Sequence, residues 1–219
     1  TNFSLLHVII ASYLRVVSQR PAINRFVSGQ TIYARNNIEV LMTIKKKMAL
    51  DAEDTCIKVE FEPTGTIYDV YDKFNKVVEA NKGDTDGNAT EDFAKILNYI
   101  PRFMLRFVIW LIKTLDYYGI LPRSIINLSP FHGSLIVTSM GSLGIRPIYH
   151  HIYDFGNLPV FVSYGAKQRG IKMDDDGEVY RYRYIEMKVV TDERICDGYY
   201  YASAFKMMKK IFENPRILE

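Results

Sequence analysis

The stretch before the last helical pattern carries the residues best suited to chemistry. It contains Asp192, Glu193 and Asp197, followed directly by Gly198. A positioned carboxylate can act as a general base, most efficiently when its pKa lies near the working pH. Glutamate ordinarily ionises near about 4.3. Such a base therefore needs burial or nearby like charges, which Asp192 and Asp197 could supply.

This stretch resembles the HxxxDG signature of the CoA-dependent acyltransferases. That superfamily includes chloramphenicol acetyltransferase and the catalytic domain of the 2-oxoacid dehydrogenase acyltransferases. Asp197 and Gly198 match the end of the signature, and Glu193 stands at the position of the catalytic histidine. Two further segments carry the resemblance: residues 133–144, GSLIVTSMGSLG, are similar to G-[TS]-F-T-[IL]-[ST]-N-[LI]-G-x-x-G, and residues 20–24, RPAIN, resemble R-x-P-x-x-N with one residue fewer.

The resemblance implies a fold, an assembly and a set of roles. The implied fold is the layered α/β (α+β) fold of chloramphenicol acetyltransferase, with a mixed sheet flanked by helices. The implied assembly is a homotrimer with CoA or acyl-CoA as substrate at the subunit interface. There a base from one subunit deprotonates a thiol or alcohol, and a hydroxyl from its neighbour stabilises the oxyanion. Thr138, or Ser139 one register away, matches that hydroxyl, and Asp197 matches the carboxylate that orients the site through an arginine.

The replaced histidine leaves three hypotheses open. Glu193 serves as the base of an altered acyl transfer, or the active site is degenerate and the chain binds acyl-CoA or has a structural role. In the third, a His-containing paralogue completes the site in a hetero-oligomer. His150 and Asp154 repeat the HxxxD spacing, so His150 or His151 is a candidate replacement base. Adjacent histidines packed in a loop are the favoured interpretation of that segment.

Length and composition indicate a single domain over residues 1–219, with an extended helical insertion at 81–122. The chain starts at Thr1 without methionine and enters a helical pattern at once, which is typical of a fragment lacking its N-terminal segment. The net charge is +3, and the longest basic run is Lys45-Lys46-Lys47. This balance gives no reason to expect a nucleic-acid partner.

The cysteine and aspartate patterns predict neither a disulfide bond nor a metal site. Two distant cysteines, Cys56 and Cys196, without a secretory signal predict reduced thiols in a cytoplasmic protein. Cys196 is expected to be a packed core residue, because its neighbours are acidic as well as basic. No His or Cys cluster has ligand spacing. Residues 174–176, three aspartates before Gly177, predict a solvated hairpin turn rather than a cation site.

The apolar stretch 103–121 is too interrupted to cross a membrane. Arg106, Lys113 and Asp116 break it, and no run of 18 uncharged residues exists. We expect a buried or interface helix and no membrane partner.

Periodicity places the remaining elements. Helical patterns are predicted over residues 6–17, from about 66 to 78, from 91 to about 118 with a break at Pro101, and over 201–212. Alternation predicts strands at 38–45, 57–61, 135–137, 160–164 and 179–190. A polar loop is expected at 81–88. In the last strand the apolar face switches partway, which requires a bulge or a cover on both faces.

Overall fold

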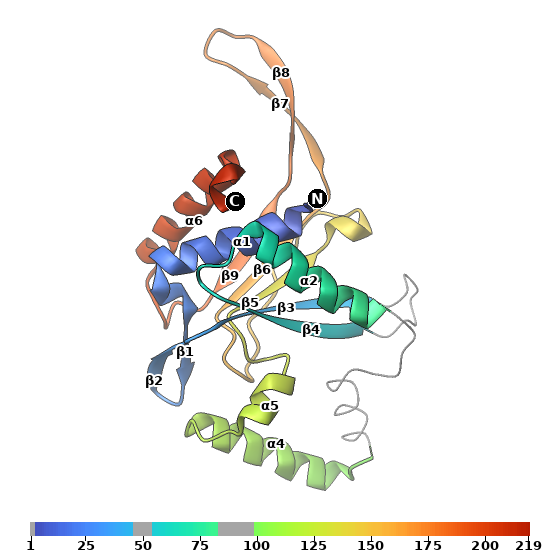
Figure 1. Cartoon of the computed structure of the whole chain (residues 1–219), viewed down its shortest axis with the longest axis vertical. Helices are drawn as coiled ribbons and strands as arrows, with labels where there is room; N and C mark the ends of the chain where they lie inside the picture. The colour runs from blue at the N-terminus through green and yellow to red at the C-terminus, as the bar shows by residue number, and fades with distance from the viewer. Residues whose placement is uncertain (1–2, 46–53, 83–98) are drawn as a thin grey trace.

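The structure, a computed structural model, describes residues 3–45, 54–82 and 99–219. Its centre is a mixed sheet of five strands in the order β4-β3-β5-β6-β9 (Figure 1). The strands are β3 (Ile38–Lys45), β4 (Asp54–Phe61), β5 (Leu135–Ser139), β6 (Val160–Tyr164) and β9 (Met187–Thr191). β3, β5 and β6 run parallel, while β4 and β9 are antiparallel to their neighbours. The predicted α/β class with a mixed sheet is confirmed.

Three helices cover one face of this sheet: α1 (Leu5–Gln19), α2 (Ile67–Lys82) and α6 (Gly198–Glu213). Each has an apolar stripe at helical spacing, and the alternating strands present their apolar side chains to it. The resulting core is continuous; its members include Ile10 and Leu14 of α1, Val70 of α2, Val137 of β5 and Ala204 of α6. α1 ends before Pro21, where a 3-10 turn, η1 (Pro21–Asn24), begins.

The other face of the sheet carries a smaller cluster formed by Leu41, Ile136, Leu158 and Phe161. The connection from β5 to β6, which includes the 3-10 turn η2 (Gly141–Leu143), reaches this face. The ring of His150 stacks on Phe161 with centroids 4.2 Å apart. The loop between β5 and β6 therefore packs against this cluster.

The segment 179–190 is two strands, not the single strand expected from its alternation. β8 (Val179–Tyr184) pairs with β7 (Gln168–Met173) in a hairpin that projects from the body, whereas β9 joins the main sheet (Figure 1). The apolar face switches because the chain changes sheets at residues 185–186. At the hairpin tip Asp174 Oδ1 accepts the backbone N–H of Glu178 at 2.8 Å, so the acidic triplet forms the predicted turn.

Several short elements lie outside the sequence prediction. β1 (Arg25–Ser28) and β2 (Thr31–Ala34) form a hairpin around Gly29, and α5 (Arg123–Leu128) and the 3-10 turn η3 (Pro215–Leu218) are also new. Most of the loop expected at 81–88, and the first part of the helical pattern from residue 91, lie outside the described residues.

The stretch 103–121 forms α4 (Arg102–Tyr117) and the turn after it. Ile112 is the buried residue of this helix. Most of the apolar side chains of α4 are exposed. Of the two expectations, the chain by itself does not give a buried helix, and an interface helix stays a prediction. Within the described ranges, none of the helices has both the length and the apolar character that a membrane crossing requires.

Candidate functional site

The segment that resembles the acyltransferase signature links the end of β9 to α6. Asp197 is the N-cap of α6, and its Oδ1 accepts the backbone N–H of Tyr200 at 2.8 Å. This bond satisfies a donor that the first helical turn leaves free. Among the described residues of one chain no arginine forms an ion pair with Asp197. Its carboxylate fixes the start of α6 and so the position of the preceding loop.

An ion pair between Asp192 and Arg194 stabilises this loop. Arg194 Nε donates to both carboxylate oxygens of Asp192, at 2.9 and 3.0 Å, and Arg194 Nη2 donates to Oδ2 at 2.7 Å. The backbone N–H of Arg194 also donates to Oδ1 at 3.0 Å. Burial raises the pKa of Asp192, but the hydrogen bonds and charge of Arg194 outweigh it, so the net pKa lies below the usual value. Asp192 is thus held ionised by its neighbour.

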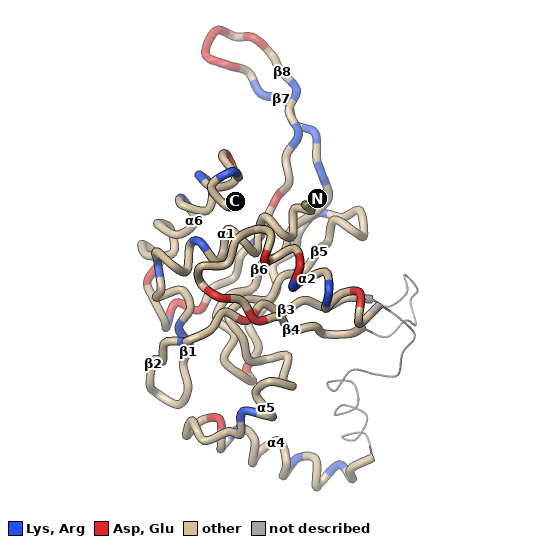
Figure 2. The backbone as a smooth tube through the Cα atoms, in the orientation of Figure 1, with Lys and Arg blue, Asp and Glu red and all other residues tan. Residues whose placement is uncertain are grey.

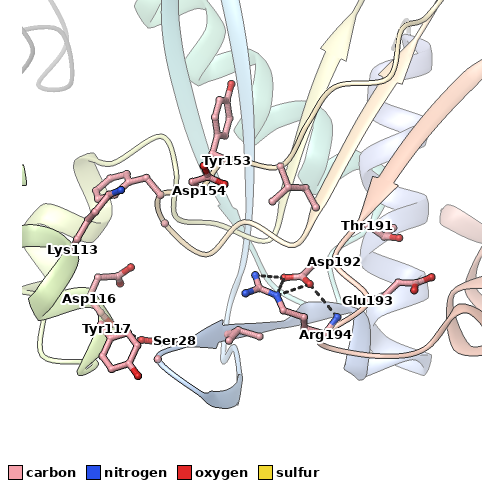
Figure 3. Close-up of a pocket in the computed structure, with 15 residues that line it drawn as sticks. Ser28, Lys113, Asp116, Tyr117, Tyr153, Asp154, Thr191, Asp192, Glu193 and Arg194 are labelled. Atoms are coloured by element: carbon pink, nitrogen blue, oxygen red, sulfur yellow. Dashed lines mark hydrogen bonds and ion pairs between the residues drawn. The ribbon is translucent and has the colours of Figure 1, made fainter.

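Glu193, between these two residues, is exposed in the isolated chain. Its Oε1 lies 3.6 Å from the point where a Cβ at Gly198 would sit, over the first turn of α6. Figure 3 shows the carboxylate directed away from the Asp192–Arg194 pair. The burial that a glutamate base needs is therefore not supplied by this chain alone, and another surface would have to cover it.

An open pocket of about 830 Å³ lies beside this loop (Figure 3). One wall is the C-terminal part of α4, with Lys113, Asp116 and Tyr117, and another is the loop with Tyr153 and Asp154. The turn of the β1–β2 hairpin and residues 191–194 complete the lining. The signature loop, the second HxxxD copy and the predicted insertion thus meet at one place. Nothing in the sequence signalled that α4 would contribute to it.

Thr138 and Ser139 lie at the far end of the sheet from this loop. Thr138 pairs with Ser163 of β6, whereas Thr191, next to the loop, pairs with Val160 at the other end of β6. Ser163 lies three residue steps along β6 from Val160, a rise of about 10 Å. Thr138 lies on the same face as Ile136, and Ser139 points to the opposite face beside Tyr164. One chain therefore does not bring Glu193 and Thr138 together.

His150 and His151, the candidate replacement bases, have different surroundings. His150 is stacked on Phe161 with its Nε2 buried and without a partner. Burial, then the neighbouring His151, lowers the pKa of His150, which favours its neutral form. The ring of His151 contacts Tyr153 edge to face. Neither histidine lines the pocket beside Glu193, although Asp154 does.

His132 is fully buried and ties α4 to the entry of β5. Its Nδ1 lies 2.7 Å from Ser129 Oγ and its Nε2 lies 3.2 Å from Asp116 Oδ1. Ser28 Oγ donates to the backbone carbonyl of Asp116. This network fixes the end of α4 that forms the pocket wall.

Both cysteines are free. Burial, the largest effect, raises the pKa of Cys196, and Cys196 packs against the main core. Burial raises the pKa of Cys56 to about 11. Both stay protonated near neutral pH, which confirms the packing role expected for Cys196.

Known structures identify the architecture, while neither a family model nor a curated protein matches the sequence. A probable dihydrolipoamide acetyltransferase from Listeria monocytogenes has a TM-score of 0.60 and 14% identity, covering 96% of this chain and 70% of that one. The chain has the fold of a dihydrolipoamide acetyltransferase core. This confirms the layered fold that the resemblance implied.

Two further structures share this acetyltransferase fold. The dihydrolipoamide acetyltransferase of Azotobacter vinelandii has a TM-score of 0.55 and 10% identity, covering 98% of this chain and 70% of that one. It was investigated for the catalytic role of a serine, a histidine and an asparagine four residues after the histidine. The cubic core of the pyruvate dehydrogenase multienzyme complex gives the same TM-score, identity and coverage.

Proposed function

We propose that this protein transfers an acyl group between CoA and a thiol or alcohol at an interface between two copies of the chain. The observation that carries the proposal is the separation of Glu193 from Thr138 at opposite ends of one sheet. Two groups that must act on the same substrate then have to come from different copies. A homotrimer, in which each copy supplies Glu193 to one site and Thr138 to the next, satisfies that requirement.

The spacing of the signature supports the proposal. Glu193 and Asp197 are four residues apart, as are the histidine and asparagine investigated in the Azotobacter enzyme. In this chain Asp197 caps α6 and holds the loop, which leaves Glu193 as the group available for proton transfer. A neighbouring copy lying over Glu193 would supply the burial that makes a glutamate an effective base.

The reaction follows from these roles. Glu193 of one copy takes the proton from the acceptor hydroxyl or thiol as this group attacks the thioester carbonyl. The Thr138 hydroxyl of the next copy donates a hydrogen bond to the oxyanion that forms, with Ser139 as the alternative donor. The intermediate collapses, the bond to sulfur breaks, and the CoA thiolate takes the proton from Glu193. The proton and the acyl group are both accounted for, and no metal is needed.

Glu193→Gln is the direct test. We expect the rate of acetyl-CoA turnover to fall by about 10²- to 10⁴-fold. The assay measures the free CoA thiol that the reaction releases. Calorimetry should show unchanged CoA binding, because the substitution is nearly isosteric. Glu213→Gln, a remote exposed carboxylate on α6, is the matched control and should keep full turnover.

The other outcomes of the binding and turnover measurements each favour a different function. CoA binding without turnover by the unaltered trimer favours the non-catalytic acyl-CoA-binding protein. Turnover that appears only with a His-containing paralogue favours the hetero-oligomer. A folded protein that neither binds CoA nor oligomerises would overturn the proposal and leave a structural role.

A further inference from the structure

The outer face of α4 carries several large apolar side chains that are exposed. Phe103, Phe107 and Trp110 are 74%, 61% and 58% exposed, and Met104 and Leu111 lie beside them. Phe103, Phe107 and Trp110 follow at i, i+4 and i+7, so they form one line along the helix. The rings of Phe107 and Trp110 are 5.7 Å apart. These five residues are called the α4 stripe below.

The stripe points away from the rest of the chain. The apolar residues of α4 that are buried or half-buried on its own chain, Ile112 with Leu105, Val108 and Leu115, lie away from the stripe around the helix. The helix α4 therefore has two apolar faces. One packs against its own chain, and the other, which carries the α4 stripe, is exposed.

Basic side chains run beside the stripe. Arg102, Arg106 and Lys113 fall at i, i+4 and i+11, which places them on a single line along one flank of the helix. The one acidic residue of α4, Asp116, is directed to His132 instead. Figure 2 shows these positive positions along α4, and α5 adds Arg123. In the described part of the chain none of the three basic residues of α4 forms an ion pair.

The position of α4 lets a flat surface reach it. The helix lies at one end of the molecule, opposite the β7–β8 hairpin, and the other labelled elements stand on one side of it (Figure 1). Aromatic and aliphatic side chains on one face with arginine and lysine on the flank are the composition of helices that lie in the membrane–water interface.

We propose that α4 is a membrane-surface helix, which inserts its stripe among the acyl chains of an anionic lipid surface while Arg102, Arg106 and Lys113 contact the headgroups. Charge complementarity selects anionic lipid as the occupant. The inference is independent of the proposed acyl transfer, and it revises the expectation that the chain has no membrane partner.

Trp110 makes the proposal directly measurable, because it is the single tryptophan of the chain. Its emission should shift to the blue when the full chain meets vesicles of phosphatidylcholine mixed with phosphatidylglycerol, and the protein should float with them. Pure phosphatidylcholine should bind it much more weakly, since each basic residue near an anionic surface strengthens binding about fivefold.

Three variants make the test specific. Phe107→Glu should abolish flotation, because it places a charge in the centre of the stripe. Arg106→Gln should weaken binding to the anionic vesicles about fivefold. Ile171→Glu on the β7–β8 hairpin, where Ile171 is 70% exposed, is the matched control and should float unchanged. All three residues are exposed, so far-ultraviolet circular dichroism should report the same fold for each variant.

Two results would overturn the proposal. One is an unchanged Trp110 emission together with no flotation on anionic vesicles. The other is a blue shift that grows with protein concentration in the absence of lipid and is removed by Phe107→Glu, because a second copy of the chain would then be what covers the stripe.

Discussion

At the scale of single residues, the signature loop is held by short-range polar contacts. The Asp192 carboxylate accepts three hydrogen bonds from the guanidinium of Arg194, and Asp197 caps α6. Glu193 is left exposed between them. The loop is rigid on both sides of the proposed base, which is what positions a group for proton transfer.

The Asp192–Arg194 pair predicts a pH dependence of stability. The folded state lowers the pKa of Asp192, so its favourable contribution is present above the unfolded value, about 3.9, and is lost as the pH falls through the folded value. Asp192→Asn should therefore destabilise the protein at neutral pH, by less than about 1 kcal/mol because the pair is partly exposed.

Urea denaturation of both proteins from pH 7 down to pH 3 checks this dependence. We expect the difference in unfolding free energy to shrink below about pH 4. A difference that stays constant across this range would show that the ion pair contributes nothing to stability.

At the scale of elements, the pocket depends on how α4 is attached. Its C-terminal end is joined to the β1–β2 hairpin and to the entry of β5 by Asp116, His132 and Ser28. Gly29 lies at the closest approach: its φ is +59°, and a Cβ there would meet the carbonyl oxygen of Tyr117 at 2.7 Å. Only glycine fits both the left-handed backbone and this contact.

Gly29→Ala should therefore destabilise the protein more than a left-handed backbone alone explains. The backbone conformation costs about 1–2 kcal/mol. Gly177→Ala is the matched control, because Gly177 has a φ of +86° and open space around its Cβ position. Urea denaturation should show a larger loss for Gly29→Ala by at least about 1 kcal/mol. Equal losses of unfolding free energy in the two variants would mean that α4 shifts away from the new methyl group at no cost.

At the scale of the whole molecule, one chain places its two proposed catalytic groups at opposite ends of the sheet. Its β7–β8 hairpin also projects away from the core. This hairpin carries the exposed residues Ile171, Met173 and Val179. Both features are accounted for by the proposed homotrimer, in which function belongs to an assembly rather than to one chain.

Subunit mixing tests the shared site. Glu193→Gln and Thr138→Ala should each be inactive alone. Mixed at equal amounts after dissociation and reassembly, they should recover about a quarter of the activity, because that share of sites combines an intact Glu193 with an intact Thr138. Size-exclusion chromatography with light scattering verifies that mixed trimers form. No recovery in such trimers would place both groups in one chain.

The sequence determined a large part of this protein. The periodicity of α1, α2 and α6 and the alternation of β3 fixed the helix-covered core, because burial of apolar faces depends on local spacing. The signature residues indicated the fold that the structural comparison confirmed. The role of Asp197 was not predicted: the resemblance implied an arginine partner, and the structure shows its carboxylate capping α6.

Only the tertiary structure decided the rest. Residues 179–190 were expected to form one strand with a switch of its apolar face, yet they divide between two sheets, because strand pairing depends on distant partners. The exposure of Glu193, its separation from Thr138 and the outward stripe of α4 depend on which surfaces the chain itself covers. Sequence spacing reports neighbours along an element, and it carries little information about contacts between elements.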